Sequence, residues 1–193
     1  MTLMFPKERS DGKCKTRSPL AAASAGHDGV TSRLASVIIS EAAFAITAAG
    51  RMWAGWEEVA QLNPPAGNNY VVAWTSAKAI EDVARRGLRV VAAPGEAYYL
   101  DMAVDDGWDA PGMTWAGTVP LETTCAFVPP DGVSGVQACL WAEHLRDLSV
   151  IDALAFPRLD AVAERGWTGE IRGGADGVRS RSTVQPRFTG SEA

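Results

Sequence analysis

The strongest constraint on the fold comes from two continuous apolar runs, YVVAW (70–74) and LRVVAAP (88–94), with a helix-like segment between them. A strand that is apolar on both faces is typical of a parallel sheet covered by helices. In the segment between the runs, Thr75 or Ser76 can cap a helix that Gly87 closes. Its inner face would carry Ala79, Ile80, Val83 and Ala84. This strand–helix–strand order predicts an α/β fold with a parallel sheet.

The flanking segments extend this pattern in both directions. Ser32 can cap a helix that ends at Gly50 and is apolar nearly all round, so we expect that helix to be buried. A later helix is predicted to be interrupted or kinked at Pro157. The polar segments 1–31 and 169–193 predict a loop and a frayed tail. The predicted elements are helices over 32–50, 75–87 and 148–167 and strands over 51–59, 70–74, 88–94 and 135–143, with a long loop before the last strand.

Length and charge exclude several classes of function. The 193 residues suffice for one domain with a sizeable core. A net charge of −5 predicts no nucleic-acid partner. Three widely spaced cysteines predict neither a disulfide framework nor a metal site. No apolar run is long enough to span a membrane and the first 15 residues lack the apolar core of a secretory signal, so we expect no membrane partner, and the compartment stays open.

Aromatic and acidic side chains cluster where the predicted strands end. They are Trp56 with Glu57 and Glu58, Trp74, Tyr99 with Asp101, and Trp141 with Glu143. In parallel α/β folds the carboxyl ends of the strands build the site. An aromatic ring suits the apolar C–H face of a pyranose, and carboxylates suit its rim of hydroxyls. The sequence therefore predicts a carbohydrate site at this end of the sheet.

Each of these residues alone has a simpler interpretation. The simpler interpretations are core tryptophans (Trp53, Trp74 and Trp167), solvated acids (Asp105 and Asp106) and an ion pair of Glu143 with Arg146 or Arg158. An unrelated Rossmann-like protein is a further alternative, but it needs a glycine-rich phosphate loop, and no such pattern is present. The coincidence at four strand ends favours a site.

Six stretches together resemble one family of enzymes. They are GWEE (55–58), VVAW (71–74), YYLDM (98–102), WAG (115–117), GVQACLWAE (135–143) and FPRLDAVAERGWT (156–168). In this order and spacing they strongly resemble the C-terminal half of the catalytic domain of family 20 glycoside hydrolases, which are β-N-acetylhexosaminidases. The resemblance implies a partial (β/α)8 TIM barrel over 32–168, with roughly strands five to eight and their helices.

The resemblance also implies a substrate-assisted, retaining mechanism. The 2-acetamido oxygen of the substrate attacks its own anomeric carbon, and Tyr99 would donate its hydroxyl to orient that oxygen. The other implied site residues are Trp56, Trp74 and Trp141 around the acetamido group and sugar face, Trp115 closing the pocket, and Asp101 and Glu143 on sugar hydroxyls. The implied partners are glycans or chito-oligosaccharides ending in N-acetylglucosamine or N-acetylgalactosamine, with no cofactor and no metal.

The chain departs from the family pattern at the general acid. The family carries an adjacent Asp-Glu pair after the fourth strand, whereas this sequence contains no Asp-Glu dipeptide. The segment DGKCKTRSP (11–19) resembles the family's D-E-C-P-K-T-x-W-x-x-S-P, which would place Asp11 on the orienting aspartate and Gly12 on the acid. We therefore interpret 1–31 as a degraded remnant of the fourth-strand loop.

This departure limits the expected activity. Losing a general acid slows a reaction by about 10²–10⁴-fold, so we expect the isolated chain to hydrolyse little or nothing. Glu57 or Glu58 is disfavoured as a replacement, because the matching acid in the family is not the proton donor. A truncated gene, a sequence fragment or a half-barrel that another chain completes would each explain the pattern. The alternative function is a non-catalytic sugar-binding remnant.

Overall fold

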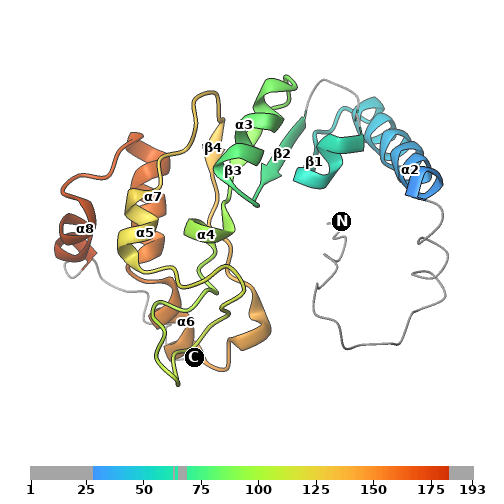
Figure 1. Ribbon diagram of the computed structural model, residues 1–193. Helices are drawn as coiled ribbons and strands as arrows, with labels where there is room; N and C mark the ends of the chain where they lie inside the picture. Colours follow the sequence, from blue (N-terminus) through green and yellow to red (C-terminus); the bar gives the residue numbers. More distant parts are fainter. Residues whose placement is uncertain (1–27, 63, 65–68, 183–193) are drawn as a thin grey trace, which may run out of the picture.

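Four parallel strands form one sheet in the computed structural model, which describes residues 28–62, 64 and 69–182 (Figure 1). The strands, in chain order and in sheet order, are β1 (Trp53–Trp56), β2 (Asn69–Ala73), β3 (Val90–Ala92) and β4 (Gly135–Val136). Val71 is the register partner of both Gly55 and Val90, and Val91 is the partner of Gly135. The predicted α/β fold with a parallel sheet is confirmed.

Helices cover one face of this sheet. They include α2 (Asp28–Ala48), the 3-10 helix η1 (Glu57–Leu62) and α3 (Ala77–Arg85). Ser76 Oγ caps α3 by accepting a hydrogen bond from the amide of Ala79 at 3.2 Å, and Gly87 takes a positive φ of 75° just after the helix. The core between helices and sheet contains Ile39, Ala43, Trp53, Val59, Val71, Ala73, Ile80, Val83, Val90 and Ala92.

The opposite face of the sheet packs against the chain that follows β3. Side chains alternate along a strand, so Val72 and Ala93 point to this second face. The helix α4 (Gly95–Tyr98) leads into a long loop whose backbone pairs with itself. Within it, the amide of Ala103 donates to the carbonyl of Met113 at 2.8 Å. Met102 and Val119 of this loop join Val72, Ala93, Tyr99 and Cys139 in one buried cluster.

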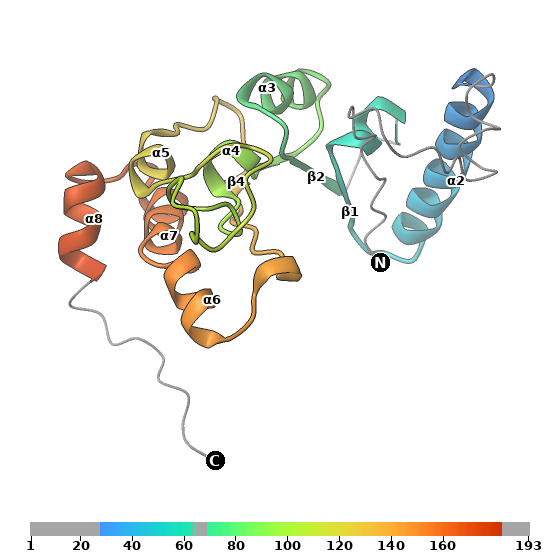
Figure 2. The ribbon, with the colours of Figure 1, turned by 60° about the horizontal axis from the view of Figure 1, so that its bottom comes forward.

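The C-terminal part is helical. It consists of α5 (Leu121–Ala126), the 3-10 helix η2 (Ala142–His144), α6 (Leu148–Ala155), α7 (Arg158–Thr168) and α8 (Gly174–Ser182). The helices α5, α7 and α8 lie together (Figure 2), where Leu121, Ala161 and Val178 form a small buried cluster. The predicted interruption at Pro157 is confirmed, because α6 ends at Ala155 and α7 begins after this proline.

Several predicted elements need correction. The helix predicted over 32–50 begins at Asp28, and it is not buried all round. Ile39 and Ala43 enter the core, whereas Leu34, Val37, Ile38 and Phe44 are exposed. Periodicity identifies the apolar residues of a helix but not which of its sides a second layer covers.

The strands are shorter than predicted, and the tail is more ordered. The segment 51–59 divides into β1 and η1, and beyond β4 only a single bridge between Cys139 and Tyr99 continues the predicted strand. The predicted long loop contains α4 and α5. The predicted tail contains α8, which buries Val178 and joins its arginines to carboxylates: Arg179 to Glu122 and Arg181 to Glu164.

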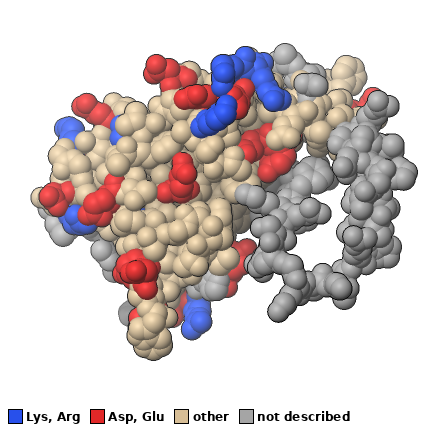
Figure 3. Space-filling model, in the orientation of Figure 1, with Lys and Arg blue, Asp and Glu red and all other residues tan. Residues whose placement is uncertain are grey.

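The described surface carries charges of both signs. The Lys and Arg side chains at the top of Figure 3 lie over α3, where Lys78 and Arg85 both pair with Asp82. Within the described ranges, no helix is both long and apolar enough to cross a membrane. The same residues contain no group of three His, Cys, Asp or Glu side chains that could hold a metal ion.

Candidate functional site

Five aromatic side chains meet at the carboxyl ends of the strands. We call Trp56, Trp74, Tyr99, Trp115 and Trp141 the aromatic cluster. Trp56 ends β1, Trp74 follows β2, Tyr99 follows β3 and α4, and Trp141 follows β4, while Trp115 comes from the long loop. All five are predicted site residues, and the structure brings them together.

Tyr99 lies at the centre of the aromatic cluster. Its ring stacks on Trp74 with centroids 6.1 Å apart and planes 20° apart. The ring of Trp115 meets it edge-on at 5.7 Å, and the ring of Trp141 lies tilted at 6.2 Å. Trp56 extends the cluster through Trp141, with centroids 5.8 Å apart. The arrangement offers both ring faces and ring edges to a ligand.

Burial keeps the Tyr99 hydroxyl protonated. The side chain is 5% exposed, and this burial is the main reason that its pKa lies far above the usual value of 10. The neighbouring Cys139 and Asp101 raise the pKa further, because both disfavour a second negative charge. The phenol is therefore a hydrogen-bond donor throughout the physiological pH range.

Asp101 is a buried carboxylate with spare accepting capacity. It is 3% exposed, and its Oδ1 has no hydrogen-bond partner among the described residues. Burial raises the pKa of Asp101, and the nearby carboxylate of Glu143 raises it further. A buried oxygen of this kind is costly to leave unpaired, so it favours a ligand that donates to it.

Glu143 lies near Asp101 but at the surface. Its side chain is exposed. The alternative ion pair with Arg146 or Arg158 is not found among the described residues, whose salt bridges involve other groups. Asp101 and Glu143 are thus one buried and one solvated carboxylate, close enough for the charge of Glu143 to raise the pKa of Asp101.

Two glutamates fix the position of Trp74. Glu57 is buried and accepts hydrogen bonds from the amides of Trp74 at 2.8 Å and Thr75 at 3.1 Å, and from the Thr75 hydroxyl. Glu58 accepts from the indole Nε1 of Trp74 at 3.1 Å. Both carboxylates are therefore engaged with the β2–α3 turn, and Glu57 in particular is a structural group.

Trp115 is the most accessible member of the aromatic cluster. Its ring is exposed, and it lies against Gly95 at the start of α4. A Cβ atom at Gly95 would be 2.9 Å from Cη2 of this ring, so any larger residue there would displace the ring from its present position. Asp105, Asp106 and Trp108 of the same loop are exposed and lie outside the aromatic cluster.

Sequence reasoning missed Arg158. This side chain is buried, and its guanidinium donates to backbone carbonyls of the loop that carries Tyr99 and Asp101. From the sequence, Arg158 is considered only as an alternative ion-pair partner of Glu143. Asp11, by contrast, lies outside the described residues.

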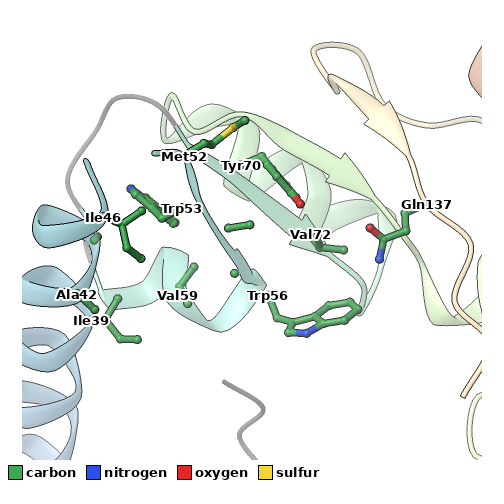
Figure 4. A pocket seen from close by; sticks show the side chains of 13 residues that line it. Ile39, Ala42, Ile46, Met52, Trp53, Trp56, Val59, Tyr70, Val72 and Gln137 are labelled. Atoms are coloured by element: carbon green, nitrogen blue, oxygen red, sulfur yellow. The ribbon is translucent and has the colours of Figure 1, made fainter. Parts of the chain in front are cut away.

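A pocket of about 460 Å³ runs beside β1, next to the site (Figure 4). Side chains of α2, among them Ile39 and Ile46, line one side of it, and Trp56, Val72 and Gln137 line the other. Residues of β1 and β2 and Gln137 after β4 thus all contribute to its lining. The edge of β1 away from β2 has no strand partner among the described residues.

Comparisons with known proteins agree on one family. The model of the glycosyl hydrolase family 20 catalytic domain matches residues 10–170. The β-hexosaminidase of Vibrio furnissii is 32% identical over 132 residues, covering 63% of this chain and 22% of that protein. The β-N-acetylhexosaminidase of Cellulomonas fimi is 33% identical over 141 residues, covering 68% of this chain and 28% of that protein.

A solved structure shows the same arrangement of the chain. The family 20 exo-β-N-acetylglucosaminidase from Vibrio harveyi, in complex with N-acetylglucosamine, matches with a TM-score of 0.71 and 29% identity. The match covers 86% of this chain and 28% of that one. The chain thus spans between 22% and 28% of the length of these relatives.

Proposed function

Because the chain belongs to glycosyl hydrolase family 20, we propose that it supplies the sugar-binding part of a β-N-acetylhexosaminidase site. The ligand would be a terminal, non-reducing N-acetylhexosamine of a glycan or chito-oligosaccharide. The observation that carries this proposal is the aromatic cluster around a protonated Tyr99, beside the unpaired Oδ1 of Asp101. The N-acetylglucosamine held by the Vibrio harveyi relative supports the choice of ligand.

Each group has a role that its environment suits. The Tyr99 hydroxyl donates to the acetamido oxygen and aims it at the anomeric carbon. Trp74 and Trp141 flank Tyr99 and exclude water from that oxygen. Asp101 accepts from a sugar hydroxyl through its free oxygen, with Glu143 at the solvent side. Trp56 and Trp115 complete the walls of the pocket.

The chemistry is substrate-assisted. As the acetamido oxygen bonds to the anomeric carbon, the glycosidic bond breaks, and the leaving oxygen takes a proton from a general acid. Water then opens the cyclic intermediate, and the anomeric configuration is retained. Protein groups contribute by orienting the acetamide and by excluding water until this second step.

The described residues offer no evident general acid. Glu57 and Glu58 are occupied by hydrogen bonds to the β2–α3 turn. The sequence has no Asp-Glu dipeptide, and Asp11 remains only a proposal for the orienting aspartate. We therefore expect the isolated chain to bind the sugar and to hydrolyse it little or not at all, which is also the behaviour of a sugar-binding remnant.

The finer fold belongs to the same proposal. Parallel strands in chain order, with α2 and α3 on one face, are what an arc of a (β/α)8 barrel requires, here roughly strands five to eight within 32–168. The edge of β1 away from β2, which has no strand partner among the described residues, is suited to a neighbouring parallel strand from outside them. A chain that carries the other half of the barrel is the partner this proposal implies.

Sugar binding and turnover test the proposal separately. Tryptophan fluorescence during titration with N-acetylglucosamine should report binding, and binding should weaken in Tyr99→Phe. Tyr98→Phe is the matched control, because the buried Tyr98 ring packs on Phe127 and its hydroxyl lies beside Arg165, outside the aromatic cluster. A folded chain that binds no N-acetylglucosamine would refute the proposal. Release of the chromophore from an N-acetylglucosaminide at the rate of an intact family member would refute the expected inactivity.

A further inference from the structure

Arg158 is 1% exposed, which makes it the most buried charged side chain of the described residues. It forms no salt bridge there and donates instead to four backbone carbonyls. Nε donates to Leu154 at 3.0 Å, and Nη1 donates to Met102 at 3.0 Å and to Val119 at 2.8 Å. Nη2 donates to Leu100 at 2.7 Å and also to Leu154. The planar fork of a guanidinium suits this arrangement, whereas an ammonium group has only three donors.

Two of these carbonyls flank Asp101, and Leu100 directly follows Tyr99. The same short segment is held from its other sides by backbone pairs. The amide of Leu100 donates to Cys139 at 2.6 Å, and the carbonyl of Asp101 accepts from Met113 at 2.7 Å. Arg158 thus supplies the hydrogen bonds to the carbonyls of Leu100 and Met102, the backbone groups on either side of the buried carboxylate.

We propose that Arg158 is a positioning residue of the sugar site, whose guanidinium fixes the backbone of Leu100 and Met102 and so directs the side chains of Tyr99 and Asp101. This inference rests on the proposed function, because it concerns how the same site holds its sugar. Arg158 itself is buried beneath the loop and does not touch the ligand.

Charge adds a second effect on Asp101. Backbone hydrogen bonds at Asp101 and Trp141 lower the pKa of this carboxylate. The titratable and charged groups around it are Glu143 after β4, Cys139 and Tyr99 beside it, and Arg158 of α7. Burial and Glu143 raise the pKa of Asp101, and Arg158 opposes them. Replacing Arg158 with a neutral side chain therefore moves the pKa of Asp101 further upward.

Arg165 is the matched control on the same helix. It is also buried and also donates to backbone carbonyls, those of Gly169 at 3.0 Å and Cys125 at 3.2 Å. Neither carbonyl belongs to the segment that carries Tyr99 and Asp101; beyond these carbonyls, the Arg165 guanidinium lies beside the hydroxyl of Tyr98, outside the aromatic cluster. A purely structural arginine should therefore behave like Arg165, and a positioning arginine should not.

The first experiment compares Arg158→Lys with Arg165→Lys in a titration with N-acetylglucosamine, at a temperature where both variants are folded. Both variants should lose stability. Only Arg158→Lys should bind the sugar more weakly, by about tenfold, while Arg165→Lys stays within about twofold of the wild-type chain. Equal affinities in the two variants would overturn the proposal.

The second experiment follows sugar binding as the pH falls. In Arg158→Gln the pH at which binding is half lost should move upward, because the neutral side chain no longer favours the Asp101 carboxylate. Arg158→Lys, which keeps the charge, and Arg165→Gln should keep the wild-type midpoint. If the pH midpoint of sugar binding is unchanged in Arg158→Gln, the charge of Arg158 does not act on the Asp101 carboxylate, and that part of the proposal is wrong. If this variant does not fold, the affinity of Arg158→Lys decides.

Hydrogen exchange separates this inference from the proposed function. If the wild-type chain binds no N-acetylglucosamine, the proposed function fails, but the positioning of the segment can still be measured. The amides of Leu100 and Ala103 should exchange faster in Arg158→Lys than in Arg165→Lys. Exchange that rises equally in both variants would show that Arg158 stabilises the fold without holding this segment, and the inference would fall.

Discussion

Glu57 holds Trp74 through the backbone, because its Oε2 accepts a hydrogen bond from the Trp74 amide at 2.8 Å across 17 positions of the chain. The same carboxylate also binds Thr75, so one buried side chain ties the end of β1 to the end of β2. The Trp74 ring stacks on Tyr99, and these hydrogen bonds hold the Trp74 backbone in the position that this stacking needs. The contact therefore connects sheet geometry to the position of a ring in the aromatic cluster.

Removing this carboxylate should destabilise the fold. In Glu57→Ala, the amides of Trp74 and Thr75 lose a charged acceptor, and we expect a loss of about 2–3 kcal/mol in the free energy of unfolding. Urea unfolding measures this loss, provided that the slope of the unfolding free energy against urea concentration is the same in the variant and the wild-type chain. The control is Glu96→Ala, since Glu96 is exposed on α4. Similar losses of stability in both variants would show that the hydrogen bonds of Glu57 to Trp74 and Thr75 do not stabilise the fold.

The buried tyrosines should resist ionisation. Burial raises the pKa of Tyr98 to about 12 and moves that of Tyr99 well above its usual value. Of the three tyrosines in the chain, at least two should remain protonated at about pH 11 in the folded protein, whereas all should titrate near 10 in urea. Ultraviolet absorbance of tyrosinate measures this, and two ionised tyrosines in a folded chain at that pH would contradict it.

The same pKa shifts give the sign of the alkaline stability change. A group whose folded pKa is raised keeps its proton longer in the folded state than in the unfolded state. The stability it contributes is complete below the unfolded pKa of about 10 and is lost as pH rises through the folded value. The free energy of unfolding should therefore fall between about pH 10 and pH 12, with a smaller fall in Tyr98→Phe.

The convergence of the site was predictable because it follows from the sheet. Trp56, Trp74 and Trp141 each stand at or just beyond the end of an apolar run, and neighbouring parallel strands end at a common edge. Their spacing along the chain therefore determined that they would meet. The proposed ligand rests in addition on the chemistry of the side chains and on the family.

Other features depend on contacts that leave no local signal. The hydrogen bond from Arg158 to Leu100 joins residues 58 positions apart, and helix α8 is held by Val178 and by ion pairs to α5 and α7. Residues 169–193 are mostly polar, and the few apolar residues at helical spacing, Ile171, Ala175 and Val178, are too sparse among glycines and arginines to predict a packed helix. The exposed apolar side of α2 was not predicted either, because the apolar residues of a helix do not indicate which of them another element covers.

The buried carboxylate of Asp101 should lower the stability of the fold and increase its affinity for the sugar. Its ionised carboxylate is buried, and burial raises its pKa, so the stability it contributes is present below the unfolded pKa of about 3.9 and is lost as pH rises through the folded value. At neutral pH, Asp101→Asn should therefore have an equal or higher melting temperature and a weaker affinity for N-acetylglucosamine. The exposed Asp105 provides the control, since Asp105→Asn should change neither. A large loss of stability in Asp101→Asn would contradict the claim that burying this carboxylate destabilises the fold at neutral pH.

Gly112 sets how closely the loop returns to the segment that carries Asp101. It has a φ of 115°, and a Cβ atom there would lie 2.7 Å from both the Ala103 nitrogen and the Asp101 carbonyl oxygen. Both contacts are backbone, so Gly112→Ala must push the paired segment apart. Gly132 also has a positive φ, 87°, but a Cβ atom there would meet nothing within 4 Å.

The two glycines therefore separate backbone strain from collision. Gly132→Ala should lower the free energy of unfolding by about 1–2 kcal/mol, the typical penalty for a left-handed non-glycine residue. Gly112→Ala should lose more than this and should also weaken the binding of N-acetylglucosamine, since Asp101 moves with its carbonyl. Urea unfolding and the fluorescence titration, applied to both variants, measure the two effects. Equal losses of stability and an unchanged affinity would mean that the loop accommodates the methyl group without moving the site.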